Sequence, residues 1–154
     1  MHPIVEAIFK GENPKSILEV GCQNGVLLDQ YANGKGIEVW GMDIADFKKG
    51  FESQTKGKFI HQDACEKWPI KDKSIDLVFS IGTLLLIQNA ESVLKEMLRV
   101  GKKVILVEFH DENEHVEEAS MYETRIFRDY NKLFSKFGIT PTIEKVEDKW
   151  VIKT

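Results

Sequence analysis

The sequence predicts an α/β protein with a doubly wound, mostly parallel sheet. Short runs rich in Val, Ile, Leu and Phe recur along the chain, and segments with helical spacing or turn residues separate them. These strand-like and helix-like segments alternate five times, which indicates crossover connections and helices on both faces of the sheet. With 154 residues, 42% of them hydrophobic, the chain can bury a substantial core. We therefore expect residues 1–154 to form a single domain.

The first part of the chain holds five strand candidates, each an apolar run. They are residues 16–20, 37–42, 58–61, 75–80 and 103–109. Two intervening segments, 25–32 and 90–100, are the clearest helices, and the second carries apolar residues at helical spacing. The strands should lie side by side, with the helices packed against them.

The sequence of the last third of the chain predicts a loop, a helix and two strands. Residues 110–120 are polar and are expected to form a loop, with no large insertion after the fifth strand. A helix capped by Gly138 should follow. Its predicted apolar face consists of Ile126, Tyr130, Leu133, Phe134 and Phe137. Residues 142–146 and 149–153 read as two strands around a tight turn, so the sheet should end in an antiparallel hairpin.

Three polar residues are expected along one flank of that helix. They are Tyr122, Arg125 and Asp129. The spacing of Arg125 and Asp129 predicts an ordinary ion pair between positions i and i+4.

Charge and composition exclude several functions. The net charge of −4 argues against general nucleic-acid binding and against binding to a membrane surface. The sequence shows neither a membrane-spanning apolar run nor a signal peptide, so we expect a cytoplasmic protein. Cys22 and Cys65 are too few for a disulfide framework and lack zinc-site spacing. We expect reduced thiols and no metal site.

The stretch "SILEVGCQNGVLL" at residues 16–28 carries the strongest functional signal. It places a glycine-containing loop after the first strand, and ligands of open α/β sheets bind at the carboxyl ends of the strands. A dinucleotide fingerprint would need glycines at positions 21, 23 and 26, but Gln23 and Val26 stand at two of them. A nicotinamide-dependent oxidoreductase is therefore disfavoured.

This loop resembles the first motif of class I S-adenosylmethionine-dependent methyltransferases. The motif reads acidic-x-Gly-x-Gly-x-Gly, and Glu19, Gly21 and Gly25 match it, while Gln23 replaces the middle glycine. The resemblance continues in order through "VWGMDIA", "FIHQDACEKWPI", "KSIDLVFSIGTLLLI" and "VLKEMLRVGKKVILVEF", over about residues 16–109. It implies a seven-stranded sheet in the order 3-2-1-4-5-7-6, with the seventh strand antiparallel.

The resemblance also implies S-adenosylmethionine as cofactor, with S-adenosylhomocysteine as product. Asp43 would accept the two ribose hydroxyls, and Asp63 and the Ala64 backbone would contact the adenine. The implied cofactor-binding residues are Glu19, Gly21, Cys22, Gln23, Gly25, Asp43, Ile44, Asp63, Ala64 and Ser80. Taken singly, each acid has a structural explanation as a local partner, a turn residue or a helix cap.

Three of these residues carry a further structural expectation. Asp43, at a strand end, is expected to face solvent. Gln23 is tolerated if its φ is negative, whereas a positive φ would cost about 1–3 kcal/mol. Cys22 is expected to pack beneath the ligand without taking part in the chemistry.

The acceptor side of the reaction is less defined. Methyl transfer from a sulfonium is an in-line displacement, and a base is needed only if a proton must leave. His110, after the fifth strand, is the candidate base, and a solvated loop histidine is the alternative. The loop "SIGTLLL" lacks the Asn/Asp-Pro-Pro-Tyr type motif, so methylation of nucleic-acid bases is not expected.

With few residues before the first strand and no insertion after the fifth, the methyl end should be open. An open site suits a large acceptor, a homodimer or a covering partner protein. Two hypotheses follow. One is an active methyltransferase acting on a small-molecule or macromolecular acceptor, and the other is a non-catalytic methyltransferase-like module that binds cofactor or a partner.

Overall fold

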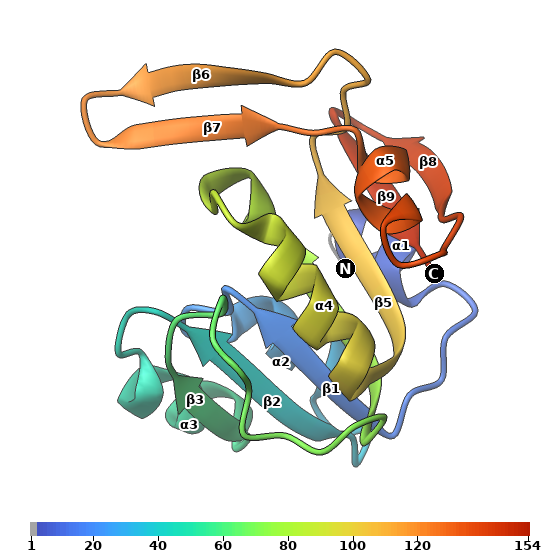
Figure 1. Cartoon of the computed structure of the whole chain (residues 1–154). Helices are drawn as coiled ribbons and strands as arrows, with labels where there is room; N and C mark the ends of the chain where they lie inside the picture. Colours follow the sequence, from blue (N-terminus) through green and yellow to red (C-terminus); the bar gives the residue numbers. More distant parts are fainter. Residues whose placement is uncertain (1–2) are drawn as a thin grey trace.

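A seven-stranded sheet forms the centre of the computed structural model, which describes residues 3–154 (Figure 1). Its spatial order is β3 (Lys58–His61), β2 (Glu38–Asp43), β1 (Ser16–Val20), β4 (Ile75–Ile81), β5 (Gly101–Glu108), β9 (Lys149–Lys153) and β8 (Thr142–Val146). The first five strands are parallel, and β9 pairs antiparallel with both β5 and β8. Counted along the chain, the sheet order is 3-2-1-4-5-7-6. The predicted fold class and strand order are confirmed.

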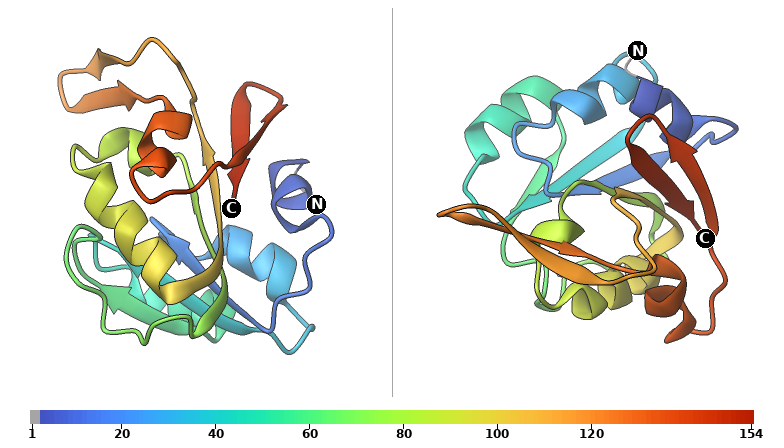
Figure 2. Two further views of the ribbon diagram at one scale, coloured as in Figure 1. Left: turned by 45° about the vertical axis from the view of Figure 1, so that its right-hand side comes forward. Right: turned by 90° about the horizontal axis from the view of Figure 1, so that it is seen from above.

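Helices cover both faces of this sheet (Figure 2). One face carries α4 (Ala90–Val100) and α5 (Tyr130–Ser135), and the other carries α1 (Pro3–Phe9), α2 (Val26–Ala32) and α3 (Lys48–Thr55). Along β5, Val104 and Leu106 pack with α4 and α5, while Ile105 and Val107 join the opposite layer. Successive side chains of a strand point to opposite faces, so a strand buried on both sides reads as a continuous apolar run.

The predicted elements of the first part are observed, with ends that differ by one or two residues. The helix α4 spans residues 90–100 as expected, and the Asn89 side chain caps it by accepting the Ser92 N–H at 3.2 Å. Two short helices, α1 and α3, had no clear signal in the sequence. In α3 only Phe51 is buried, so the segment offers no apolar periodicity. Among residues 3–154, no helix combines the length and the apolar character that crossing a bilayer requires.

The segment after β5 differs from the prediction. It forms a separate two-stranded hairpin of β6 (His115–Ser120) and β7 (Glu123–Phe127), which projects from the body of the molecule (Figure 1). The prediction of a loop at 110–120 is wrong for residues 115–120, which form β6, and the hairpin stands where no large insertion was expected. Ile126 lies in β7, opposite Val116, and does not belong to the last helix. Val116, Thr124 and Ile126 are β-branched, which suits a pleated pair of strands.

The last helix begins only at Tyr130. The side chain of Asp129 accepts the N–H groups of Asn131 and Lys132, so Asp129 caps the helix and does not form the predicted pair with Arg125. The Arg125 Nε instead lies 2.6 Å from Glu123 Oε1 within β7. Three members of the predicted apolar face are buried as expected, namely Tyr130, Leu133 and Phe134.

Candidate functional site

A cavity of about 400 Å³ opens at the carboxyl ends of β1, β2 and β4. We call it the carboxyl-edge pocket. Its lining consists of Gly21, Gln23, Asp43, Ile44, Phe47, Asp63, Ala64, Ile81, Gly82, Thr83, Leu86 and Ile87. The pocket lies where β1 has β2 on one side and β4 on the other, which is where the order of the connections reverses. This is the position at which open α/β sheets bind their ligands.

Most of the sequence-predicted residues meet in this pocket. Gly21, Gln23, Asp43, Ile44, Asp63 and Ala64 belong to its lining, whereas Glu19, Cys22, Gly25 and Ser80 do not. The residues that sequence reasoning did not assign to the site are Phe47, Ile81, Gly82, Thr83, Leu86 and Ile87. Three of these, Gly82, Thr83 and Leu86, follow β4 in the stretch "SIGTLLL". The position of this stretch after a strand was the sequence signal that could have placed these residues in the site.

The turn after β1 leaves no room for side chains at two glycines. Gly21 has φ 77°, and a Cβ there would lie 2.1 Å from Thr83 Oγ1. Gly25 has φ 75°, and a Cβ there would meet the side chains of Thr55 and Phe51 at 2.6 and 2.8 Å. Gly21 therefore lets the backbone approach the β4 loop, while Gly25 allows α3 to pack against the turn.

Gln23 has the left-handed conformation that the sequence left open. Its φ is 48°, which costs a non-glycine residue about 1–3 kcal/mol. In this conformation its N–H donates to Asp43 Oδ2 at 3.0 Å. The substitution of glycine by Gln23 is thus accommodated at the expense of local strain.

Asp43 connects the two loops that form the pocket floor. Besides the Gln23 N–H, its carboxylate accepts the Ala45 N–H at 3.0 Å through Oδ1. The side chain is half-buried, so the expected solvent-facing acid faces solvent only in part. A carboxylate offers about four lone-pair positions, so both oxygens keep capacity for further hydrogen-bond donors.

Glu19 is a buried carboxyl directly before the turn. It is 3% exposed, and its Oε2 has no hydrogen-bond partner among the described residues. Burial raises the pKa of Glu19 to about 8, and the negative charge of Asp43 contributes. Ser80, in β4, is also fully buried, and its hydroxyl has no hydrogen-bond partner within residues 3–154. Burial likewise raises the pKa of the Cys22 thiol, which disfavours a reactive thiolate.

The segment after β4 is held by a second buried carboxylate. Glu108, at the end of β5, is fully buried and accepts the N–H groups of Thr83 and Leu84 at 3.0 and 2.9 Å and of Leu85 at 3.3 Å. Burial raises its pKa to about 7, and these three hydrogen bonds oppose the shift. Sequence reasoning missed Glu108 because its partners lie more than twenty residues away in the chain.

Arg128 holds the carbonyl groups of the same segment. Its guanidinium donates to the oxygens of Leu84 at 2.6 Å, Gln88 at 3.2 Å and Ile87. Arg128 directly follows β7, so the base of the hairpin is fastened to the turn that lines the carboxyl-edge pocket.

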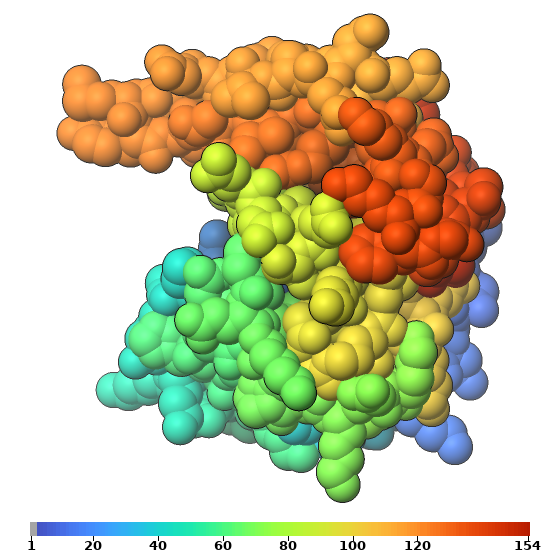
Figure 3. All heavy atoms as spheres, viewed as in Figure 1, coloured from blue at the N-terminus to red at the C-terminus, as the bar shows by residue number. Residues whose placement is uncertain are grey.

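A second cavity, of about 740 Å³, lies beneath the hairpin. We call it the hairpin groove. Figure 3 shows the hairpin overhanging a hollow beside the yellow-green η1 (Leu84–Leu86). Its lining consists of Leu86, Gln88, Glu114, His115, Val116, Thr124, Ile126, Phe127 and Arg128. Leu86 also lines the carboxyl-edge pocket, so the two cavities adjoin.

His110 lies at the base of the hairpin and lines neither cavity. Its Nδ1 accepts the Tyr130 N–H at 3.2 Å and lies 3.9 Å from Asp129 Oδ1. Its ring meets Trp150 edge-on, and the side chain is 9% exposed. It is therefore not a solvated loop histidine. An accepting Nδ1 leaves the proton of the neutral ring on Nε2, so this arrangement offers no free nitrogen to receive a proton.

The strain at Gln23 generates a first prediction. Gln23→Gly should raise the free energy of unfolding by about 1 kcal/mol in urea denaturation, because glycine adopts positive φ without the Cβ clash. Lys56→Gly is the matched control, since Lys56 has φ 58° at the end of α3 and does not line the pocket. A loss of stability in Gln23→Gly alone would show that the Gln23 side chain itself stabilises the loop.

Glu19 generates a prediction for pH dependence. Its folded pKa of about 8 exceeds the ordinary 4.5, so the folded state binds more protons than the unfolded state between these values. The free energy of unfolding should fall as pH rises through this window. Glu19→Gln should remove that decrease. In thermal unfolding, the stability of the variant relative to the parent protein should therefore increase as pH rises. Glu66→Gln, on an exposed side chain, is the control. Parallel profiles for Glu19→Gln and the parent would contradict the assignment.

Comparison with known proteins gives the family. A sequence model of the methyltransferase domain matches residues 18–104, which is more than half of the chain. A sterol 4-C-methyltransferase of Caenorhabditis elegans, strm-1, is 26% identical over 160 residues, covering 96% of this chain. The chain spans about half of that relative, namely 47% of its length.

Solved structures share the fold at low identity. A 1,6-didemethyltoxoflavin-N1-methyltransferase of Burkholderia thailandensis, with 1,6-didemethyltoxoflavin and S-adenosylhomocysteine bound, superposes with a TM-score of 0.81 at 12% identity, covering 99% of this chain and 76% of that one. A methyltransferase in complex with the Haloferax volcanii Trm112 activator gives a TM-score of 0.70 at 18% identity, covering 87% and 66%. Given the extent of the sequence match and the strand order, the chain belongs to the methyltransferase domain family and has the class I methyltransferase fold.

Proposed function

We propose that this chain is an S-adenosylmethionine-dependent methyltransferase that binds its cofactor in the carboxyl-edge pocket. The observation that carries the proposal is the convergence of the glycine turn, Asp43 and Asp63 on one cavity at the reversal point of the sheet. These residues come from three separate strand ends. Their order along the chain matches the motifs that the sequence resembles.

The residues present fit this cofactor in shape and charge. Gly21 lines the pocket without a side chain, and the Asp43 carboxylate retains acceptor capacity for ribose hydroxyls. Asp63 is exposed, and its Oδ1 also accepts the Cys65 N–H at 2.8 Å. Exposed Ile44 and half-buried Phe47 offer apolar surface.

Bound in this pocket, S-adenosylmethionine supplies an electrophilic methyl group on a sulfonium. The protein's own contribution is then alignment, because an in-line displacement needs the acceptor held at a defined distance and direction. The turn at Thr83–Leu85 is suited to this role, because buried Glu108 fixes its N–H groups and Arg128 holds carbonyls of the same segment. The acceptor would enter from the hairpin groove, which adjoins at Leu86.

The relatives support methyl transfer without naming the acceptor of this chain. One neighbour binds S-adenosylhomocysteine, and another is held in a complex with a methyltransferase activator. A partner protein or a second copy over the site stays a prediction, although the hairpin already overhangs part of it. A single domain over residues 1–154 and a cytoplasmic location also stay predictions.

A non-catalytic methyltransferase-like module remains the second candidate. The observation that favours it is the strained Gln23, which stands in place of the middle glycine of the motif and directs its N–H to Asp43. Such a module would bind cofactor or a partner without turnover.

Cofactor binding should appear as thermal stabilisation. At about 100 times the dissociation constant, S-adenosylmethionine or S-adenosylhomocysteine should add about 2.7 kcal/mol, which is a rise in Tm of about 5–10 °C for a chain of this length. NAD should produce no rise, because the glycine spacing does not match its fingerprint. Absence of any shift at millimolar cofactor would remove the proposal.

Asp43→Ala should weaken cofactor binding by about 1.5–3 kcal/mol for each charged hydrogen bond lost. It should also lower the free energy of unfolding, because the Gln23 and Ala45 N–H groups lose their acceptor. Asp46→Ala separates the two effects, since Asp46 accepts one backbone N–H, from Lys48, and does not line the pocket. In isothermal titration, equal affinity losses in both variants would argue against a direct contact between Asp43 and the cofactor.

The role of His110 is decided by a pair of variants. On the observed geometry, His110→Asn should keep turnover, because its side-chain oxygen can still accept the Tyr130 N–H, whereas His110→Ala should lose stability of about 1–3 kcal/mol. A general base would behave differently. Both variants would then lower turnover by about 10²–10⁴-fold with cofactor affinity unchanged.

A further inference from the structure

We propose that the hairpin groove binds an uncharged, largely apolar small molecule, and that this molecule is the methyl acceptor. The second clause rests on the proposed function, whereas the binding itself does not. The groove of about 740 Å³ lies within the range of small-molecule sites and adjoins the carboxyl-edge pocket at Leu86. An occupant would therefore lie beside the proposed cofactor.

Every charged side chain of the groove is already engaged within the protein. Arg128 is 8% exposed, and its guanidinium donates to three carbonyl groups of the β4–α4 segment. Glu114 accepts from Lys132 Nζ at 2.9 Å, and this hydrogen bond holds the pKa of Glu114 below its ordinary value. An anionic ligand would find the Arg128 guanidinium already occupied by three carbonyl groups, and a cationic ligand would have to share Glu114 with Lys132.

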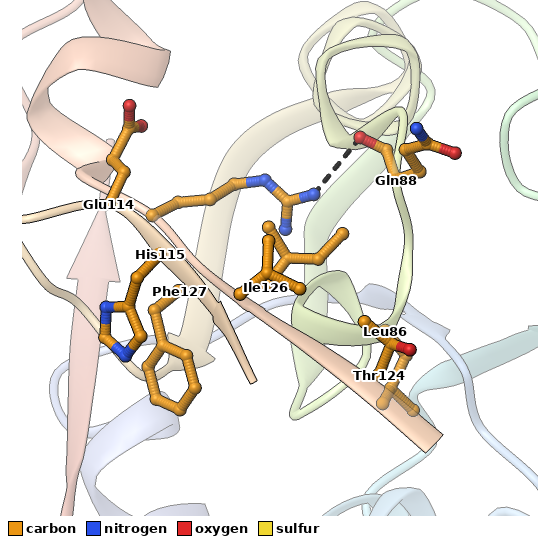
Figure 4. A pocket seen from close by; sticks show the side chains of 9 residues that line it. Leu86, Gln88, Glu114, His115, Thr124, Ile126 and Phe127 are labelled. Carbon is orange, nitrogen blue, oxygen red and sulfur yellow. Dashed lines mark hydrogen bonds between the residues drawn. The ribbon is translucent and has the colours of Figure 1, made fainter. Parts of the chain in front are cut away.

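The histidine of the groove is engaged in the same way. Its Nδ1 lies 2.9 Å from the Asn113 carbonyl oxygen, and its Nε2 lies 3.2 Å from Glu117 Oε1. The His115 ring also stacks on Phe127, with centroids 4.5 Å apart and an angle of 3° between the planes (Figure 4). Both hydrogen-bond partners of the ring are acceptors, so both ring nitrogens donate, and the charge of the ring is paired with Glu117. What His115 offers a ligand is the face of its ring.

The remaining lining is apolar or neutral. Leu86 and Val116 are 51% and 62% exposed. Ile126 and Phe127 also line the groove and are half-buried. Exposed apolar side chains that gather around a concavity are typical of ligand or partner sites. The side chains of Gln88 and Thr124 make no hydrogen bond within residues 3–154, so they can meet one or two neutral polar groups of the ligand.

The acidic hairpin suggests one competing occupant, a basic protein segment. Within the groove, however, the acidic side chain is Glu114, which already pairs with Lys132. The exposed carboxylates of Glu112 and Glu118 do not line the groove. The lining itself therefore favours a neutral ligand.

Two dyes that differ in one charged group test the proposal. N-phenyl-1-naphthylamine is neutral, and 1-anilinonaphthalene-8-sulfonate is the same ring system with a sulfonate. In fluorescence titrations of the full chain without cofactor, the neutral dye should bind at least tenfold more tightly than the sulfonate. Val116→Arg should lower the affinity for the neutral dye at least tenfold. Met121→Arg is the matched control, because Met121 is 88% exposed between β6 and β7 and does not line the groove.

Three results would overturn the inference. These are equal affinity for the two dyes, equal losses in Val116→Arg and Met121→Arg, or displacement of the neutral dye by hexa-arginine peptide. The last would indicate a basic protein segment in the groove. Thermal shifts with S-adenosylmethionine, measured on the same variants, report separately on the proposed function. A failure of the proposed ligand binding in the groove can therefore be distinguished from a failure of the proposed cofactor binding.

Discussion

The carboxyl-edge pocket and the hairpin groove both depend on how one buried carboxylate holds the turn after β4. Glu108 is fully buried at the end of β5 and accepts three consecutive N–H groups, from Thr83, Leu84 and Leu85. An uncompensated buried carboxylate would be costly, and these N–H groups offset much of that cost. Because Thr83 lines one cavity and Leu86 lines both, the position of this turn sets the shape of the whole site.

Arg128 extends the same constraint to the hairpin. It holds carbonyl groups of the turn segment whose N–H groups Glu108 holds, so the segment is fixed from β5 and from the end of β7. The hairpin β6–β7 forms no pairing with the main sheet, and its strand β6 is exposed throughout. Its orientation over the site therefore depends on this attachment and on the packing of residues at its base.

The floor of the carboxyl-edge pocket combines strain with preorganisation. Gln23 occupies a left-handed conformation that costs free energy, and its N–H is thereby directed at Asp43. Asp43 in turn accepts the Ala45 N–H, so one carboxylate orders the loops after β1 and β2. Strain that persists at a ligand-binding edge is consistent with function, because the surrounding contacts maintain it.

The sequence by itself determined the class of fold, the strand order implied by its motifs, and the lining residues at the ends of β1, β2 and β3. Apolar runs and glycine spacing are local properties, and strand ends of a parallel sheet meet at one edge whatever the details of packing. Only the tertiary structure decided the hairpin, the roles of Glu108 and Arg128, and the half-buried state of Asp43. The residues 115–127 alternate too weakly to distinguish strand from loop or helix. The partners of Glu108 and Arg128 lie far away in the chain, so their hydrogen bonds depend on how the strands and the hairpin come together in space.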